Sequence, residues 1–273
     1  MDYGDPAGRP VLLFHGVPGS RLQGHPDRSI AGALGVRLIG VDRPGYGLSD
    51  DQRGRTLLDW PDDVVALADH LGLERVALLS ISGGGPYAAA CAWKIPERLV
   101  TVCLVSAMGP TDASETIANM PMLNRFMLML AKRSERLVSL PAAALVALAR
   151  RRPAWFLAVL NAHLPAVDRA MYVRPEIQAA LREDIAEAFR AGGQGAIRDI
   201  VLLATPWGFG LHEIRVPMQL WHGQRDATVP LPIGHALAAA LPRCQAHFVP
   251  NAGHFLVMDC WQQILTELVQ TDQ

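Results

Sequence analysis

The sequence predicts an α/β fold in which helices cover both faces of a mostly parallel sheet. Short, β-rich apolar runs alternate along the chain with segments of helical periodicity, which is typical of strands connected through helices. The runs are continuous rather than alternating between apolar and polar residues, as expected for strands buried on both faces. With 273 residues, half of them hydrophobic, the chain can bury a large core.

Six apolar runs are the strand candidates, and four segments between them are the helix candidates. The expected strands are 10–16 (PVLLFHG), 36–42 (VRLIGVD), 75–82 (RVALLSIS), 99–107 (LVTVCLVSA), 216–223 (VPMQLWHG) and 244–250 (CQAHFVP). The expected helices are 57–71, 83–93, 234–241 and 256–269. The connections between neighbouring elements are short, as in ordinary βα and αβ units.

Residues 111–206 interrupt this alternation. No strand pattern appears there, and Met, Leu, Ala and Arg dominate a series of helix-like segments. We expect these segments to break at proline, because proline lacks the backbone N–H that a helix needs. The prolines are Pro121, Pro141, Pro153, Pro165 and Pro175. The sequence therefore predicts a helical insertion at 111–206, in a core made of residues 1–110 and 207–273.

One expected strand runs directly into a glycine-rich turn, SISGGGPYAAA (80–90), with Ser82 at its centre. A sharp strand-to-helix turn strains its central residue and requires small residues two positions before and after it. Ser80 and Gly84 meet this requirement, although the strict pattern has glycine at position 80. A phosphate-binding loop is the alternative, but the full G-x-G-x-x-G spacing is absent. We therefore predict that Ser82 is a nucleophile.

A serine nucleophile needs a base, and the base needs an acid that fixes its tautomer. Asp226 and His254 each follow an expected strand. The carboxyl ends of parallel strands meet at one edge of the sheet, where ligands bind, and the chain order Ser, Asp, His is typical of such a triad. We predict His254 as the base and Asp226 as the acid. Asp112 is the alternative acid, because it also follows a strand.

The first expected strand ends in a glycine-containing loop, FHGVPGS (14–20). Such a loop lets backbone approach a reacting carbonyl closely. The N–H groups of Val17 and Gly83 are therefore the predicted donors of an oxyanion hole. We expect His15 to support the loop through side-chain hydrogen bonds. The alternative is that His15 is itself the catalytic base.

Five motifs, in this order, resemble those of the α/β-hydrolase superfamily, in the branch with a helical cap: HGVPGSR, VDRPGYGLSD, SISGGGPYAAA, WHGQRDATVP and NAGHF. The resemblance covers nearly the whole chain outside 111–206. It implies that 111–206 forms a lid over the site. The family usually begins with an antiparallel hairpin, whereas only nine residues precede the first expected strand here, so we expect either a truncated reading frame or a missing edge of the sheet.

The Met-rich stretch MPMLNRFMLML (120–130) is the candidate lining of a substrate pocket, because methionine adapts to irregular apolar spaces. The pocket residues we predict are Met120, Met122, Phe126 and Met127. The alternative is that this stretch packs only within the insertion.

Composition and patterning argue against several classes of partner. A net charge of −1 gives no reason to expect nucleic acid or an anionic membrane. The start of the chain has no signal-like segment, and the longest apolar run is too short to span a bilayer. We expect a cytoplasmic protein with four reduced cysteines and no cofactor. No H-x-x-x-H or H-E-x-x-H spacing indicates a metal. Nothing in the pattern determines the oligomeric state.

The predicted activity is hydrolysis of carboxylic esters with small to medium acyl chains. An aspartate at position 82 would have indicated a dehalogenase or epoxide hydrolase, and a cysteine a dienelactone-type hydrolase. Iminopeptidase, thioesterase, perhydrolase and carbon–carbon bond hydrolase share the triad, so they stay open as alternatives. A non-catalytic ligand-binding protein and a cofactor-independent oxygenase on the same fold are the rivals from other classes.

Overall fold

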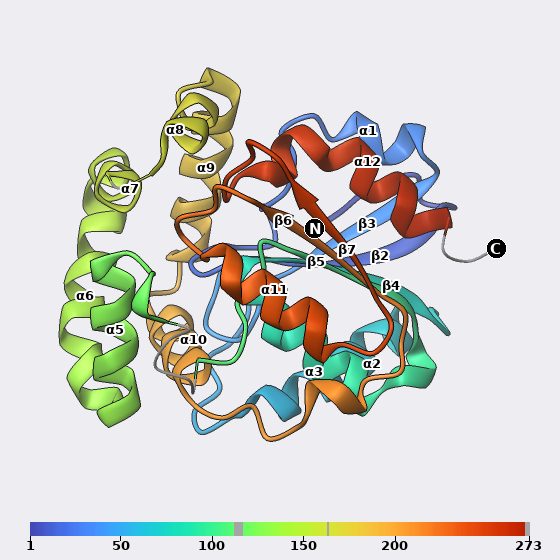
Figure 1. Cartoon of the computed structure of the whole chain (residues 1–273), viewed down its shortest axis with the longest axis horizontal. Helices are drawn as coiled ribbons and strands as arrows, with labels where there is room; N and C mark the ends of the chain where they lie inside the picture. Colours follow the sequence, from blue (N-terminus) through green and yellow to red (C-terminus); the bar gives the residue numbers. More distant parts are fainter. Residues whose placement is uncertain (112–116, 163, 271–273) are drawn as a thin grey trace.

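The computed structural model describes residues 1–111, 117–162 and 164–270, and it confirms the predicted α/β architecture (Figure 1). The sheet has seven strands in the order β1-β3-β2-β4-β5-β6-β7. Neighbouring strands are parallel except for β1 and β3, which are antiparallel. The strands are β1 (Asp2–Gly4), β2 (Arg9–Phe14), β3 (Val36–Val41), β4 (Val76–Ile81), β5 (Leu99–Val105), β6 (Met218–Gly223) and β7 (Cys244–Val249).

Helices cover both faces of this sheet (Figure 1). Alternate residues of a buried strand belong to two core clusters; in β4, for example, Leu78 lies in one cluster and Leu79 in the other. One face is covered by α1 (Ser29–Ala33) and α12 (Leu256–Gln270). The other is covered by α2 (Trp60–His70), α3 (Gly85–Lys94) and α11 (Leu231–Ala240). Single 3-10 turns are η1 (Leu57–Asp59), η2 (Ser82–Gly84), η3 (Pro96–Arg98) and η4 (Leu211–Glu213).

The stretch between β5 and β6 contains helices and no strand among its described residues. We call α5 to α10 the helical segment; it gathers beyond the carboxyl ends of the strands (Figure 1). Its members are α5 (Met122–Arg133), α6 (Glu135–Arg151), α7 (Pro153–Asn161), α8 (Ala166–Tyr172), α9 (Pro175–Ala188) and α10 (Gln194–Ala204).

Four of the five prolines in this segment stand where helices begin. Pro121 and Pro165 precede α5 and α8, and Pro153 and Pro175 are the first residues of α7 and α9. The prediction was wrong at Pro141, which lies inside α6. That helix continues because its buried side chains, on both sides of the proline, pack as one face, and packing outweighs the single lost hydrogen bond. These side chains are Val138, Ala142, Val146 and Ala149.

Two short elements were missed by the sequence analysis. α1 has five residues and β1 three, too few to show a period. β1 pairs with β3, with Asp2 opposite Ile39, so this edge carries a short antiparallel strand. Several expected strands also end earlier than predicted, because their last residues already belong to loops at the carboxyl edge.

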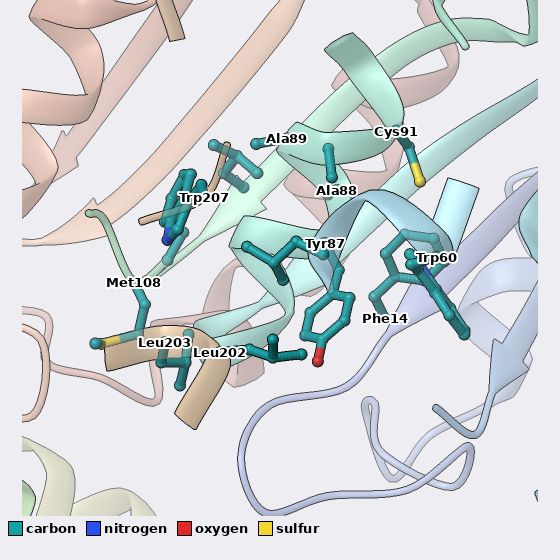
Figure 2. Close-up of a cluster of buried hydrophobic side chains, with 14 of the residues drawn as sticks. Phe14, Trp60, Tyr87, Ala88, Ala89, Cys91, Met108, Leu202, Leu203 and Trp207 are labelled. Carbon is teal, nitrogen blue, oxygen red and sulfur yellow. The ribbon is translucent and has the colours of Figure 1, made fainter. Parts of the chain in front are cut away.

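The larger core cluster joins the sheet to the helical segment (Figure 2). Trp60 lies between Phe14 and Tyr87, with ring centroids 5.3 and 5.9 Å away and edge-to-face geometry. Leu202 and Leu203 of α10 belong to the same cluster. The helical segment and the sheet therefore share one core on this side. Within the described residues, no helix has the length and apolar character needed to cross a membrane.

Candidate active site

Ser82 occupies a strained turn directly after β4. Its φ is +52°, in the left-handed region that side chains other than glycine rarely adopt. The turn is tight: a Cβ placed on Gly84 would lie 2.6 Å from the carbonyl oxygen of Phe14, and one on Gly85 would lie 2.7 Å from Ala107 Cβ. Only glycine fits at these positions, so the turn holds the half-buried Ser82 side chain at the carboxyl edge of the sheet.

Ser80, where the strict pattern has glycine, is fully buried, and its hydroxyl donates to the carbonyl oxygen of Cys103 on the neighbouring strand at 3.3 Å. The extra hydroxyl therefore has a partner in β5. Replacing Ser80 with glycine would remove this bond between two central strands, so we expect a small loss of stability.

Asp226 and His254 form the clearest polar pair at this edge. His254 Nδ1 lies 2.8 Å from Asp226 Oδ2, and because a carboxylate only accepts, the imidazole donates through Nδ1. The other carboxylate oxygen accepts the N–H groups of Thr228 and Val229, both at 2.8 Å. The loop after β6 thus fixes the acid, and the acid leaves His254 Nε2 free to take a proton. The alternative acid, Asp112, lies outside the described residues.

The backbone at the end of β5 links the two halves of the site. Met108 N–H donates to the Ser82 carbonyl oxygen at 3.0 Å, and the Ser106 hydroxyl donates to the His254 carbonyl oxygen at 3.1 Å. Ser106 also has a positive φ, +47°. The structure therefore brings the predicted nucleophile, base and acid to the same edge through the ends of β4, β5, β6 and β7.

The charges around His254 favour its protonated form. Burial by itself lowers the pKa of this imidazole, but the charge and hydrogen bond of Asp226, and the charge of Asp168, outweigh burial and raise the pKa above its usual value. His222, at the end of β6, has the opposite balance, because burial dominates and lowers its pKa. Its Nε2 lies 2.9 Å from the Val229 carbonyl oxygen, so it supports the acid loop as a neutral ring.

The predicted oxyanion loop is held by several side chains. Gln23 Oε1 accepts the Gly16 N–H at 2.6 Å, and Arg43 donates to the carbonyl oxygens of His15 and Gly16. Among the described residues, the Val17 N–H has no hydrogen-bond acceptor within the protein. It also lies beside Gly83, because a Cβ there would be 3.3 Å from Val17 N. The two predicted donors therefore lie together next to Ser82.

His15 has the supporting position expected for it. It is fully buried, its Nδ1 lies 2.8 Å from the Gly16 carbonyl oxygen, and its Nε2 accepts the Arg43 N–H at 3.3 Å. Burial and the neighbouring guanidinium of Arg43 hold the pKa of His15 well below its usual value. It stays neutral within the loop.

A largely apolar cavity opens at Ser82, with about 910 Å3 of space free of protein atoms, including the part open to solvent. Its floor contains Val17, Ser82 and Gly83, and the helical segment supplies most of its walls. Those wall residues include Met127, Ala142, Phe156 and Ile200, and the neighbouring Met120, before α5, and Phe189, after α9, also line the cavity. The described lining residues include Asn124 and Thr228 as polar side chains but no Lys, Arg, Asp or Glu.

Two of the four predicted pocket residues lie at this cavity and two lie away from it. Met120 and Met127 line the cavity and are buried. Met122 and Phe126 are 80% and 50% exposed and do not line it. α5 is amphipathic, and its turn places residues 122 and 126 on the face opposite the cavity.

Sequence reasoning missed three buried aspartates of the helical segment that bind loops at the carboxyl edge: Asp168 on α8, Asp184 on α9 and Asp199 on α10. Asp168 accepts the N–H groups of His254 and Phe255, both at 3.0 Å. Helical periodicity was the available signal, because each aspartate stands at a position that periodicity would assign to an apolar, buried face.

Asp184 and Asp199 hold the loop that follows β2. Asp184 accepts the N–H and hydroxyl of Ser20, at 2.8 and 2.6 Å, and its burial raises the pKa of this carboxyl to about 7. Asp199 accepts Arg43 at 2.7 Å and also the hydroxyls of Tyr46 and Tyr87. Two carboxylates of the helical segment therefore fix the loop that carries Val17.

The chain belongs to the α/β hydrolase fold family, whose sequence model matches residues 9–259. An uncharacterized hydrolase of Bacillus subtilis is 34% identical over 101 residues, 37% of this chain. The chain spans 35% of that protein's length and 65% of a second curated relative's length.

Two further proteins resemble the chain along nearly all of its length. A 2-hydroxy-6-oxononadienedioate/2-hydroxy-6-oxononatrienedioate hydrolase of Cupriavidus pinatubonensis is 27% identical, over 90% of this chain and 80% of its own. The solved structure of a thermophilic esterase from Thermogutta terrifontis matches with a TM-score of 0.69 and 25% identity, covering 99% of this chain and 90% of that one.

Proposed function

We propose that the chain is a serine hydrolase that cleaves carboxylic esters of small to medium acyl chain, with Ser82 as nucleophile, His254 as base and Asp226 as acid. The observation that carries this proposal is the Asp226–His254 pair at the edge where the left-handed Ser82 borders an apolar cavity. In this proposal the helical segment, within residues 111–206, is the cap that shapes the acyl pocket.

The proposed reaction has two steps. Ser82 Oγ attacks the ester carbonyl carbon while His254 Nε2 takes the hydroxyl proton, and the N–H groups of Val17 and Gly83 bind the oxyanion. The intermediate then releases the alcohol, which receives the proton from His254, and the acyl group stays on Ser82. Water gives a proton to His254 and attacks the acyl carbon, which releases the carboxylic acid and restores the serine hydroxyl.

Carbon–carbon bond hydrolysis is the second candidate, because of the similarity to the Cupriavidus enzyme. The substrate in that enzyme's name is a dicarboxylate. The described residues lining this cavity offer no arginine or lysine to pair with a second carboxylate, and burying an unpaired charge is costly. The uncharged lining therefore favours a neutral ester.

Labelling with a fluorophosphonate tests the proposed nucleophile. We expect one adduct, located on Ser82 by mass spectrometry of the digested protein, and none in Ser82→Ala. Ser139→Ala is the matched control, because Ser139 is a partly exposed helical serine bonded to the Glu135 carbonyl oxygen, and it should label like the unmodified chain. Absence of the Ser82 adduct in folded protein would refute the hydrolase proposal.

A substrate panel separates the two reactions. We expect p-nitrophenyl esters to be cleaved with a kcat/KM far above that for a 2-hydroxy-6-oxo-dienoate carrying a second carboxylate. The reverse order would favour the carbon–carbon bond hydrolase.

A further inference from the structure

One side chain of the helical segment contacts the residue that we propose as the catalytic base. Asp168 of α8 is 1% exposed, and its two carboxylate oxygens accept the N–H groups of His254 and Phe255, 86 and 87 residues further along the chain. These N–H groups lie just before the first turn of α12. Asp168 therefore binds the backbone of the residue whose imidazole faces Asp226.

Gly253 makes this approach possible. A Cβ placed on Gly253 would overlap the Asp168 carboxylate. The φ of Gly253 lies outside the left-handed region, so glycine is required here for space rather than for backbone conformation. The loop before His254 is thus shaped to receive a carboxylate from the helical segment.

The titratable groups around the imidazole come from β6, from the loop that follows it and from α8. Asp226 follows β6, His222 ends β6, and Asp168 comes from α8. Of these, the two carboxylates favour the imidazolium that forms when His254 accepts the serine proton. Burial raises the pKa of the Asp168 carboxyl, and the hydrogen bonds from the two N–H groups oppose this rise. The His254 loop is therefore the main stabiliser of the ionised Asp168 side chain.

We propose that Asp168 is a positioning residue of the hydrolytic site, which fixes the His254 backbone from the helical segment and supplies a second negative charge to the imidazolium. This inference rests on the proposed function. It means that the helical segment contributes to the chemical step as well as to the pocket.

The test compares Asp168→Asn with Met171→Ala. Met171 lies one turn further along α8 and is buried in the core cluster that also contains the buried side chains of α12. Its truncation therefore weakens the docking of α8 without changing charge. For Asp168→Asn we expect kcat to fall about tenfold while KM stays within roughly threefold. The acid limb of the pH dependence of kcat should move to lower pH by roughly half a pH unit. For Met171→Ala we expect lower stability and an unmoved acid limb.

The pKa of His254, followed by NMR of its imidazole protons, gives a readout that does not depend on turnover, and Asp168→Asn should lower it. If Asp168→Asn does not fold, Gly253→Ala provides the second variant, because its methyl group displaces the carboxylate while keeping the charge, and the limb should again move down. An unmoved limb and an unmoved imidazole pKa in the folded variant would overturn the inference.

Failure of this inference is distinguishable from failure of the proposed function. If Ser82 of the unmodified chain takes the fluorophosphonate and Asp168→Asn behaves like Met171→Ala, Asp168 is only a structural anchor. If the unmodified chain takes no label, the proposed function itself fails, and the NMR titration still reports whether Asp168 acts on His254.

Discussion

The strand ends and the helical segment contribute to the same cavity by different means. At the strand ends, backbone geometry does most of the positioning: a left-handed turn at Ser82 and a loop whose N–H groups bind Asp226. In the helical segment, apolar side chains form the walls, and buried aspartates fix the surrounding loops. In the proposed hydrolase, a few turns at the strand ends hold the reacting groups, whereas the helices shape the acyl pocket and, through Asp168, help to hold the base.

The largest expected effect comes from a substitution at the strand ends, at Asp226. Asp226→Asn keeps the shape of the side chain but can present an N–H₂ group to His254 Nδ1, which favours the wrong tautomer. We expect kcat for a p-nitrophenyl ester to fall by roughly 10³ to 10⁴-fold with little change in the thermal midpoint. A loss below about tenfold would show that another carboxylate serves the base, and Asp112→Asn would then be the variant to measure.

A smaller effect is expected from crowding the predicted oxyanion hole. In Gly83→Ala the new methyl group would lie 2.5 Å from Val17 Cγ2, so the loop must move away. We expect kcat to fall about 100-fold with KM nearly unchanged. The double variant Gly83→Ala with Val17→Ala removes the closest contact, although Val17 Cβ stays 3.0 Å from the new methyl group, and should recover part of the loss. No recovery would indicate that the Gly83 position itself is essential.

A larger side chain in the cavity wall tests the contribution of the helical segment. Ala142 of α6 is buried and lines the cavity. Ala142→Phe should shift the ratio of kcat/KM for butyrate over octanoate esters about tenfold toward the shorter chain, because the longer acyl group loses its space. Ala144 on the same helix is exposed, and Ala144→Phe should leave the ratio unchanged. An unchanged ratio in Ala142→Phe would place the acyl group elsewhere.

The smallest effect concerns stability. The folded-state pKa of Asp184 is about 7, above the ordinary value of 3.8, so the native state retains a proton that the unfolded chain has released. The free energy of unfolding should therefore fall as pH rises from about 4 to about 7 and level off above that. Asp184→Asn lacks this titration and should show a flatter pH dependence in urea unfolding. Equal slopes for the two proteins would contradict this prediction.

The sequence predicted the sheet well because strand and turn signals are local. The six expected strands all occur, and Ser82, Asp226 and His254 all lie at the carboxyl edge. β1 was missed because its pairing with β3 depends on a partner more than thirty residues away. Local patterns carry no such information.

The helical segment was harder to predict because its important contacts are long-range. Asp168, Asp184 and Asp199 each bind a loop that is remote in the sequence, and no spacing rule connects them. The exposed positions of Met122 and Phe126 could not be predicted for a similar reason, since composition identified a Met-rich helix but not the face that it turns to the cavity. Packing between helices determines that face.

The Arg43–Asp199 pair limits how substrate can reach the cavity. Both side chains are almost completely buried, and separating them would leave each charge without its partner. α10 therefore cannot swing away from the sheet as part of a rigid lid at low energetic cost. In the proposed hydrolase, substrate is therefore expected to enter and product to leave through smaller motions of the other helices, with α10 staying packed on the sheet.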